Sequence, residues 1–522
     1  MNFFRRILSV LLCVCMLCGC SGGFAENVGD TLVVGILSTK TNALRPFEPK
    51  ERELVSVYNI MYDSLIQIDD NGLPQPKLAE SWAEVGSGKT WVFYLRKDVT
   101  FSDGSPLTAA DVEASANYIL SLATDEGVAD HGFYASMQYI IESVKATDDY
   151  TVTVKTRRGS YEILYAMTFP VVKAEQVAED CPLGSGPYVV SQFEPGSYLM
   201  LDFNTNWWQL PPQVRSISVM MYPNNSELIS AYQYGRVDAV FTRSVAAAQY
   251  KSGTSSLSIS YNTRQLETLM INHRTRSFPL DSLYVRQAIR YAINLDLIAS
   301  NVYMGMTQDA DAMIPSDSWL YLDQESKFVY NPDKARELLA EDGWVDIDEN
   351  GVLDKFVGDE PEPKHLRLSL YVYEDPYNDL RYEAANMIAS DLANVGIDIH
   401  VETVSYEHCK EVLQNGTFDL CLCAWQLDVV PDYGFLLMKN QGTNVGRYNS
   451  SPMDSMYTTL RSVTDQAEFA YTAQSIQQQF YEDVPFICLF YRRGIILTRK
   501  MFTTVRTVRE FELFRGIETF GK

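Results

Sequence analysis

Hydrophobic and polar residues recur with a regular period along several parts of the chain. Thr31–Leu37 is a short apolar run of the kind that forms a buried strand. Val285–Ile293 places its apolar residues at the i, i+3, i+4, i+7 and i+8 spacing of an amphipathic helix. Ile397–Val404 alternates apolar and polar residues, as a half-buried strand does. The pattern therefore predicts a mixture of helices and strands.

Turn and capping signals place further elements between these. Thr108 is a good helix N-cap, and Asp111 stands at the third helical position, close to a capping box. A helix over Asp379–Asn394 stops before Gly396, and the strand at Ile397 follows directly. This order favours a sheet covered by helices in the second half of the chain, and an α/β fold. We also predict strands at Trp91–Leu95, Thr151–Val154 and Asp419–Trp425, and a helix over Asp333–Leu339 after Pro332.

The first thirty residues have the pattern of an export signal. Arg5 and Arg6 precede the apolar run Ile7–Leu17, which is too short to span a bilayer. The run ends in small residues before Cys20, as in a bacterial lipobox. We therefore predict a signal peptide over residues 1–19, lipid on Cys20, and a tether over residues 20–30. An ordinary cleaved signal is the alternative.

The cysteines that would remain after Cys20 are odd in number and match neither a disulfide scaffold nor a CxxC pair. Cys421 and Cys423 are two apart in a predicted strand, so they face the same side. We expect these cysteines to be buried free thiols, and one disulfide among them is the alternative. The remaining cysteines are Cys181, Cys409, Cys421, Cys423 and Cys488.

Composition narrows the function classes. The 522 residues exceed what one hydrophobic core usually serves, so two or more lobes are expected. The net charge of −24 argues against a nucleic-acid partner, because binding phosphates requires concentrated Lys and Arg.

Two short motifs imitate ligand-binding loops. Gly86–Thr90 resembles the end of a phosphate-binding loop, but Ala83 replaces a required glycine and a strand follows, so a hairpin turn is favoured. Asp346–Gly351 resembles half of a calcium loop, but Val357 stands where a bidentate Glu is needed. A solvated turn is favoured there too, with weak calcium binding left open.

No recognisable catalytic motif or zinc-type spacing occurs, and the five histidines form no cluster in the sequence. An exported hydrolase or an adhesin stays a less favoured alternative to a binding protein, and we predict no enzyme activity, no cofactor and no metal site.

Several stretches, in order along the chain, are similar to the extracytoplasmic solute-binding proteins of family 5, the peptide- and nickel-binding receptors of ABC importers. Physically, most of these motifs mark turns, caps and close backbone approaches; Gly184 and Gly186, for example, allow the backbone to pass near another segment. The matching stretches are Leu78–Val112, Gly184–Tyr188, Glu227–Val240, Val285–Asn294, Tyr330–Leu339 and Gly343-Trp344.

The resemblance implies a two-lobed periplasmic-binding-protein fold with an extra domain and a ligand enclosed between the lobes. The lobes would be joined by two hinge connections near Asn272 and Pro485, and closure would signal to the importer's permease subunits. Domain I would comprise residues 27–55, 185–270 and 485–522, domain II residues 56–184, and domain III residues 271–484.

The resemblance also suggests ligand-binding residues. In peptide-binding members, an acid shortly after a W-x-x pattern pairs with the peptide's α-amino group. Here Trp425 and Asp428 match, so Asp428 is the candidate amine anchor and Trp425 an apolar wall; the alternative is that Asp428 caps a loop.

Dipeptide-binding members carry an Arg before a Pro-Tyr-Asn motif, and this Arg grips the ligand carboxylate. Here Asp375 precedes Pro-Tyr377-Asn, and an aspartate cannot form the two-bond pair that an arginine forms with a carboxylate. We therefore expect a longer peptide or one with a cationic side chain, with Asp375 and Tyr377 at the site. A nickel chelate, haem or an oligosaccharide stays an alternative ligand within the same fold.

Overall fold

The computed structural model describes residues 31–38, 41–49, 51–86, 88–122, 133–134, 136–253, 256–274, 278–323, 328–374, 380–499 and 508–517. The predicted signal peptide, the tether with Cys20, and the candidate site residues Asp375 and Tyr377 lie outside the described residues. No helix in the described ranges is long and apolar enough to cross a membrane.

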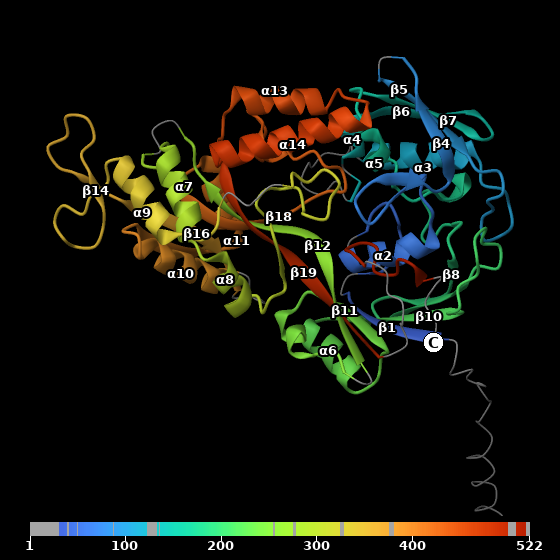
Figure 1. The fold of residues 1–522 in the computed structure, drawn as a ribbon. Helices are drawn as coiled ribbons and strands as arrows, with labels where there is room; N and C mark the ends of the chain where they lie inside the picture. Colours follow the sequence, from blue (N-terminus) through green and yellow to red (C-terminus); the bar gives the residue numbers. More distant parts are fainter. Residues whose placement is uncertain are drawn as a thin grey trace, which may run out of the picture.

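One large sheet runs through the middle of the molecule, and its two longest strands, β12 and β19, pair with each other (Figure 1). Of the strands beside them, β18 pairs with β12 and β11 pairs with β19. In order the strands are β17 (Asp398–Val404), β16 (Arg367–Tyr373), β18 (Leu420–Gln426), β12 (Ser256–Ile271), β19 (Phe486–Arg499), β11 (Ala239–Thr242), β1 (Thr31–Leu37), β10 (Ser216–Tyr222), β9 (Tyr198–Phe203) and β8 (Tyr188–Glu194), with β13 (Thr307–Asp309) on β19.

The antiparallel pairing of β12 with β19 is interrupted where the two halves of the sheet meet. Asn262 pairs with Arg493 and Leu266 pairs with Tyr491, so three residues of β12 lie opposite one residue of β19. Such an irregularity bends a strand and redirects its side chains. Asn272 and Pro485, at the other end of these strands, border the pair, and the hinge positions near them stay a prediction.

Residues 66–156 form a second, antiparallel sheet and a short hairpin. β4 pairs with β5, with Glu84 opposite Trp91, so the Gly86–Thr90 motif connects a hairpin as predicted. The strands are β4 (Ala79–Glu84), β5 (Thr90–Leu95), β7 (Thr151–Thr156) and β6 (Ile141–Asp148), beside the pair β2 (Ile66–Ile68) and β3 (Pro74–Pro76).

The helices confirm the periodicity and capping signals. In α7 the predicted apolar face is buried. At the start of α3 the Thr108 N–H and hydroxyl donate to the Asp111 carboxylate, which is the reciprocal half of the predicted capping box. The helices are α2 (Arg52–Met61), α3 (Ala109–Leu122), α4 (Met137–Ile140), α5 (Ile163–Ala166), η1 (Ala174–Gln176), α6 (Asn225–Gln233), η2 (Val245–Gln249), α7 (Leu283–Ala292), α8 (Leu295–Asn301), α9 (Pro332–Glu341), α10 (Leu380–Ala393), α11 (Tyr406–Asn415), α12 (Gly434–Leu437), α13 (Ser451–Leu460) and α14 (Gln466–Asp483).

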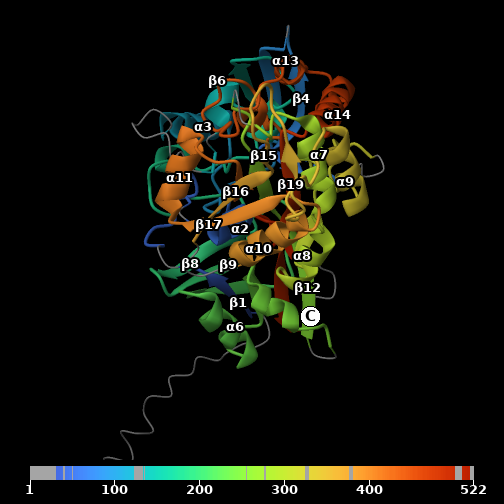
Figure 2. The same cartoon turned by 90° about the vertical axis from the view of Figure 1, so that its left-hand side faces the viewer.

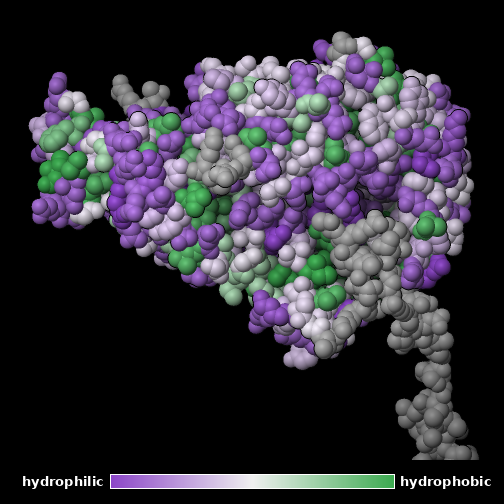
Figure 3. Space-filling view, viewed as in Figure 1, coloured by the Kyte–Doolittle hydropathy of each residue, from purple (hydrophilic) through white to green (hydrophobic). Residues whose placement is uncertain are grey.

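Helices α13 and α14 lie along one side of the sheet and reach α4 and α5, while α10 and α11 lie near β16 and β17 (Figures 1 and 2). The surface in Figure 3 is largely hydrophilic, and hydrophobic residues gather at the end where β14 (Asp354–Lys355) and β15 (Lys364–His365) project. Val345, Ile347 and Phe356 are exposed apolar side chains of that projection.

The five cysteines in the described ranges are free thiols, as expected, and all but Cys181 are buried. Cys409 and Cys421 have their Sγ atoms 3.7 Å apart, without a bond between them. Burial raises the pKa of the Cys181 thiol to about 11, which keeps it protonated at neutral pH.

Gly186 confirms the predicted close backbone approach. Its N–H donates to the Met61 carbonyl over 3.0 Å, and a Cβ atom at this position would lie 2.6 Å from the Met61 carbonyl carbon. The loop before β8 therefore packs directly on the end of α2.

We expect Gly186→Ala to lower the free energy of unfolding by about 1–3 kcal/mol, because backbone on both sides of the contact must move. Urea denaturation measures this change. Gly442→Ala is the matched control, since a Cβ atom there meets nothing within 4 Å. Equal effects of the two substitutions would contradict the packing argument.

Candidate functional site

A cavity of about 360 Å³ lies where α2, the loop after β18 and residues 509–517 come together. Its size is within the range of small-ligand sites in proteins. A smaller cavity of about 90 Å³ adjoins it. The residues that line both are Ile68, Tyr165, Arg264, Val429, Arg509 and Glu510.

Asp428 lines the larger cavity, two residues beyond the end of β18. The N–H groups of Val429 and Val430 donate to its Oδ1. Burial raises the pKa of the Asp428 carboxyl, and hydrogen bonds from Ser136 and Val429 oppose that shift. No cationic side chain in the described ranges forms an ion pair with it. The charge of Arg264 also lowers this pKa. The structure thus brings the predicted anchor to a cavity as a half-buried acid that forms no ion pair with a described residue.

Trp425 lies outside the lining of both cavities. Its ring packs edge-on against Phe435, with the ring centroids 6.3 Å apart. Its indole N–H is buried and has no hydrogen-bond partner among the described residues. The predicted contact of Trp425 with a ligand therefore stays a prediction.

Arg264 is a lining residue that sequence reasoning missed. It lies in the irregular part of β12, and its Nη1 donates to the backbone carbonyl of Asp428 over 2.7 Å. A signal was present, because the four consecutive polar residues Asn262–Gln265 break the alternation of polar and apolar residues that precedes them. Periodicity does not say that this run faces a cavity.

The other cations of the larger cavity have carboxylate partners. Lys77 lies 3.0 Å from Asp63 and Arg509 lies 2.8 Å from Glu512. Arg515 pairs with Glu512 at 3.2 Å.

These cations also affect Glu512. Burial would raise the pKa of Glu512, but Arg509 and Arg515 outweigh it and leave the pKa below its usual value. Arg264 is the cation of this lining that has no ion-pair partner in the described part of the chain.

The segment at residues 508–517 closes one side of the cavity. The Arg509 guanidinium donates to the carbonyls of Ile68 and Asp69, and the Glu510 carboxylate accepts hydrogen bonds from the Arg264 N–H and from Gln426. Residues near the end of the chain thus join the β2–β3 hairpin to the strands β12 and β18.

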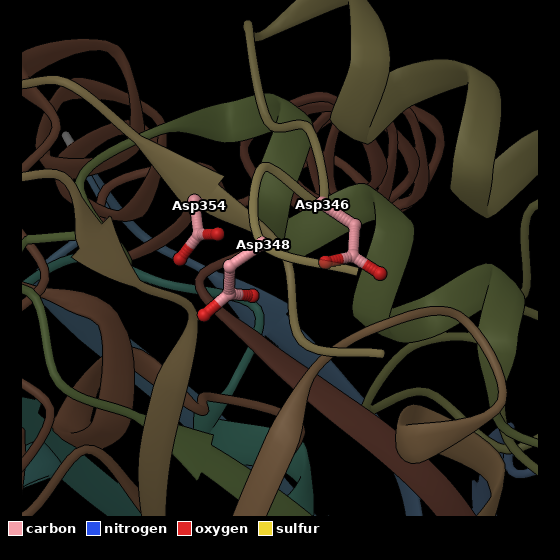
Figure 4. A group of neighbouring side chains, drawn as sticks. All are labelled: Asp346, Asp348 and Asp354. Atoms are coloured by element: carbon pink, nitrogen blue, oxygen red, sulfur yellow. The ribbon is translucent and has the colours of Figure 1, made fainter. Parts of the chain in front are cut away.

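The predicted turn at Asp346–Gly351 is confirmed, and it lies far from the cavity, at the projecting β14 end. The side chains of Asp346, Asp348 and Asp354 point toward one another there (Figure 4), and their ligand atoms lie within 4.8 Å. The N–H groups of Asn350 and Gly351 donate to Asp346, as in a solvated turn. The predicted absence of a metal site stays a prediction.

The described part of the chain thus combines a mixed α/β fold built on one large sheet with a partly charged cavity beside β12 and β18. The chain belongs to the bacterial extracellular solute-binding proteins, family 5, whose model matches residues 74–447. This finding confirms the predicted family.

The similarity to individual relatives covers nearly the whole chain. The oligopeptide-binding protein AppA of Bacillus subtilis is 26% identical over 525 residues, covering 93% of this chain and 92% of the relative. The solved AppA structure, in complex with a nonapeptide, has a TM-score of 0.66 at 21% identity and covers 94% of this chain and 98% of that one.

A protein solved with a bound metal complex has the same fold. NikZ of Campylobacter jejuni, solved in complex with Ni(L-His), has a TM-score of 0.71 at 20% identity and covers 94% of this chain and 99% of that one. The structural matches confirm the two-lobed α/β fold. Members of the family are binding proteins, and the predicted class of solute-binding receptor is confirmed.

Proposed function

We propose that this chain captures peptides between its two lobes and delivers them to an ABC importer, without turnover. The observation that carries the proposal is the half-buried Asp428 carboxylate, which lines a ligand-sized cavity and has no cation in an ion pair with it in the described ranges. A carboxylate in such a site binds an ammonium group far better than a surface carboxylate does. AppA, the relative that matches over 93% of this chain, is named for oligopeptide binding.

The proposal includes lipid attachment at Cys20 to the outer face of the cell membrane. A tether keeps the receptor on the same surface as the importer and raises its effective concentration there. Incorporation of radiolabelled palmitate tests the lipid attachment. We expect the wild-type protein to be labelled and the Cys20→Ser variant to lose the label.

We also propose the three-domain division at residues 27–55 with 185–270 and 485–522, 56–184, and 271–484. The division is consistent with the sheets: β4 to β7 form a separate sheet within residues 56–184, and β16 to β18 lie within residues 271–484. Limited proteolysis that releases stable fragments with other boundaries would overturn it.

Calorimetry with a matched pair of tetrapeptides, one with a free N-terminus and one N-acetylated, tests Asp428 as the binding residue for the peptide's ammonium group. We expect acetylation to weaken binding about 10- to 100-fold, because the loss of a charged hydrogen bond costs about 1.5–3 kcal/mol. Asp428→Asn should remove most of this difference.

The control for Asp428→Asn is Asp333→Asn, at an exposed surface acid. Native mass spectrometry of the freshly purified protein identifies a retained ligand directly. A retained nickel chelate, haem or oligosaccharide, together with no peptide binding in the calorimeter, would replace the peptide proposal by that ligand.

A further inference from the structure

Two opposite charges at the larger cavity form no ion pair with a described residue. The Asp428 carboxylate has no cation paired to it there, and the Arg264 guanidinium has no carboxylate. The remaining cations of that lining pair with carboxylates of the protein. Both side chains are half-buried, and the Arg264 charge lowers the pKa of Asp428 without an ion pair between them. A ligand that carries an ammonium and a carboxylate can form a direct charged pair with each of the two groups.

The two groups are held close together by the chain itself. Arg264 Nη1 donates to the Asp428 backbone carbonyl over 2.7 Å, and the Leu427 N–H donates to the Arg264 carbonyl over 2.9 Å. The guanidinium therefore contacts the backbone of the same residue that carries the anchor carboxylate.

Arg264 also has hydrogen-bonding capacity to spare. A guanidinium carries five N–H groups in a fixed fork, and the Asp428 carbonyl takes one of them. No other partner of this guanidinium occurs among the described residues. The free edge of the fork matches a carboxylate in a two-bond, charge-assisted pair.

We propose that Arg264 is the carboxylate-recognition residue of this receptor, and that the site selects a short zwitterionic peptide. This inference rests on the proposed function, since Asp428 binds the ligand's ammonium group. Arg264 supplies the cation that the motif around Asp375 lacks. Together, Arg264 and Asp428 therefore favour a short peptide with both termini free. Asp375 alone suggests a longer or cationic ligand.

The test is a calorimetric comparison of an unblocked dipeptide with the same dipeptide amidated at its C-terminus. We expect the wild-type protein to bind the free acid about 10- to 100-fold more tightly than the amide. Arg264→Gln keeps a donor for the Asp428 carbonyl but removes the charge. In this variant the free acid should bind no better than the amide.

Two controls separate ligand recognition from a structural role. Arg336→Gln, at an exposed arginine of α9, should leave the preference for the acid unchanged. Asp428→Asn should weaken both ligands but keep the acid above the amide. If Arg264 only positions the loop after β18, Arg264→Gln will weaken acid and amide equally, and the proposal is overturned.

The outcomes also separate this inference from the proposed function. Peptide binding without any acid-over-amide preference overturns the role of Arg264 and leaves the peptide receptor standing. A wild-type protein that binds neither these dipeptides nor the tetrapeptides contradicts the peptide receptor itself. Tighter binding of a Lys-containing tetrapeptide than of the free dipeptide would restore the longer, cationic ligand.

Discussion

Asp432→Ala is expected to lower the free energy of unfolding by about 3–5 kcal/mol, the cost of breaking a buried ion pair from one side. The Asp432 side chain is 7% exposed. Arg461 donates to it from Nε over 2.6 Å and from Nη2 over 3.1 Å, and Arg158 donates over 3.0 Å. Without Asp432, Arg461 loses both of these bonds while it stays mostly buried.

The matched control is Asp333→Ala. Asp333 also pairs with an arginine, Arg336, over 2.7 Å, but its side chain is 92% exposed. An exposed pair of this kind contributes about 1 kcal/mol or less. Urea denaturation of both variants measures the difference, and a cost below about 1 kcal/mol for Asp432→Ala would show that the cluster does not stabilise the fold.

The Asp432 cluster joins parts of the chain that lie in different proposed domains. Arg158 belongs to the proposed domain II, and Asp432 and Arg461 belong to the proposed domain III. Backbone contacts beside the cluster link the same parts, since Tyr161 N–H donates to the Val463 carbonyl over 2.7 Å. Asp432→Ala should therefore also loosen the packing of α5 near α13 and α14 (Figure 1).

Local structure was largely predictable because short-range physics decides it. The amphipathic period of Val285–Ile293, the Thr108 cap and the glycine at residue 186 each depend on neighbours in the sequence or on a steric rule. Asp428 was found through a resemblance that places an acid after Trp425. Its position at a cavity follows from the end of β18, which was predicted within one residue.

Contacts between distant segments were not predictable in the same way. Arg264 meets Asp428 across 164 residues, and Arg158 meets Asp432 across 274 residues. No periodicity links such pairs, because the tertiary fold alone sets their distance. The closure of the cavity by residues 508–517 was missed for the same reason.

Glu162 is the group of this cluster most sensitive to pH. Its side chain is fully buried, and Arg158 Nη2 lies 3.3 Å from its Oε2. Neither carboxylate oxygen accepts a hydrogen bond from a described residue. Burial, reinforced by the like charge of Asp432, raises the pKa of Glu162 to about 8, although Arg158 and Arg461 oppose the shift. The folded protein therefore holds a proton on Glu162 at pH values where the unfolded chain has released it.

Because the pKa of Glu162 is raised on folding, the stability contributed by its protonated form is present at low pH and is lost as the pH rises from about 4.5 to about 8. Glu162→Gln mimics the protonated form at every pH. We expect the wild-type free energy of unfolding to fall by roughly 3–5 kcal/mol relative to Glu162→Gln between pH 5 and pH 8.5. Urea denaturation across this range measures it, with Glu337→Gln, at an exposed glutamate, as the control. Parallel curves for the wild type and Glu162→Gln would mean that Glu162 is already ionised in the folded protein, in which case Arg158 and Arg461 outweigh burial.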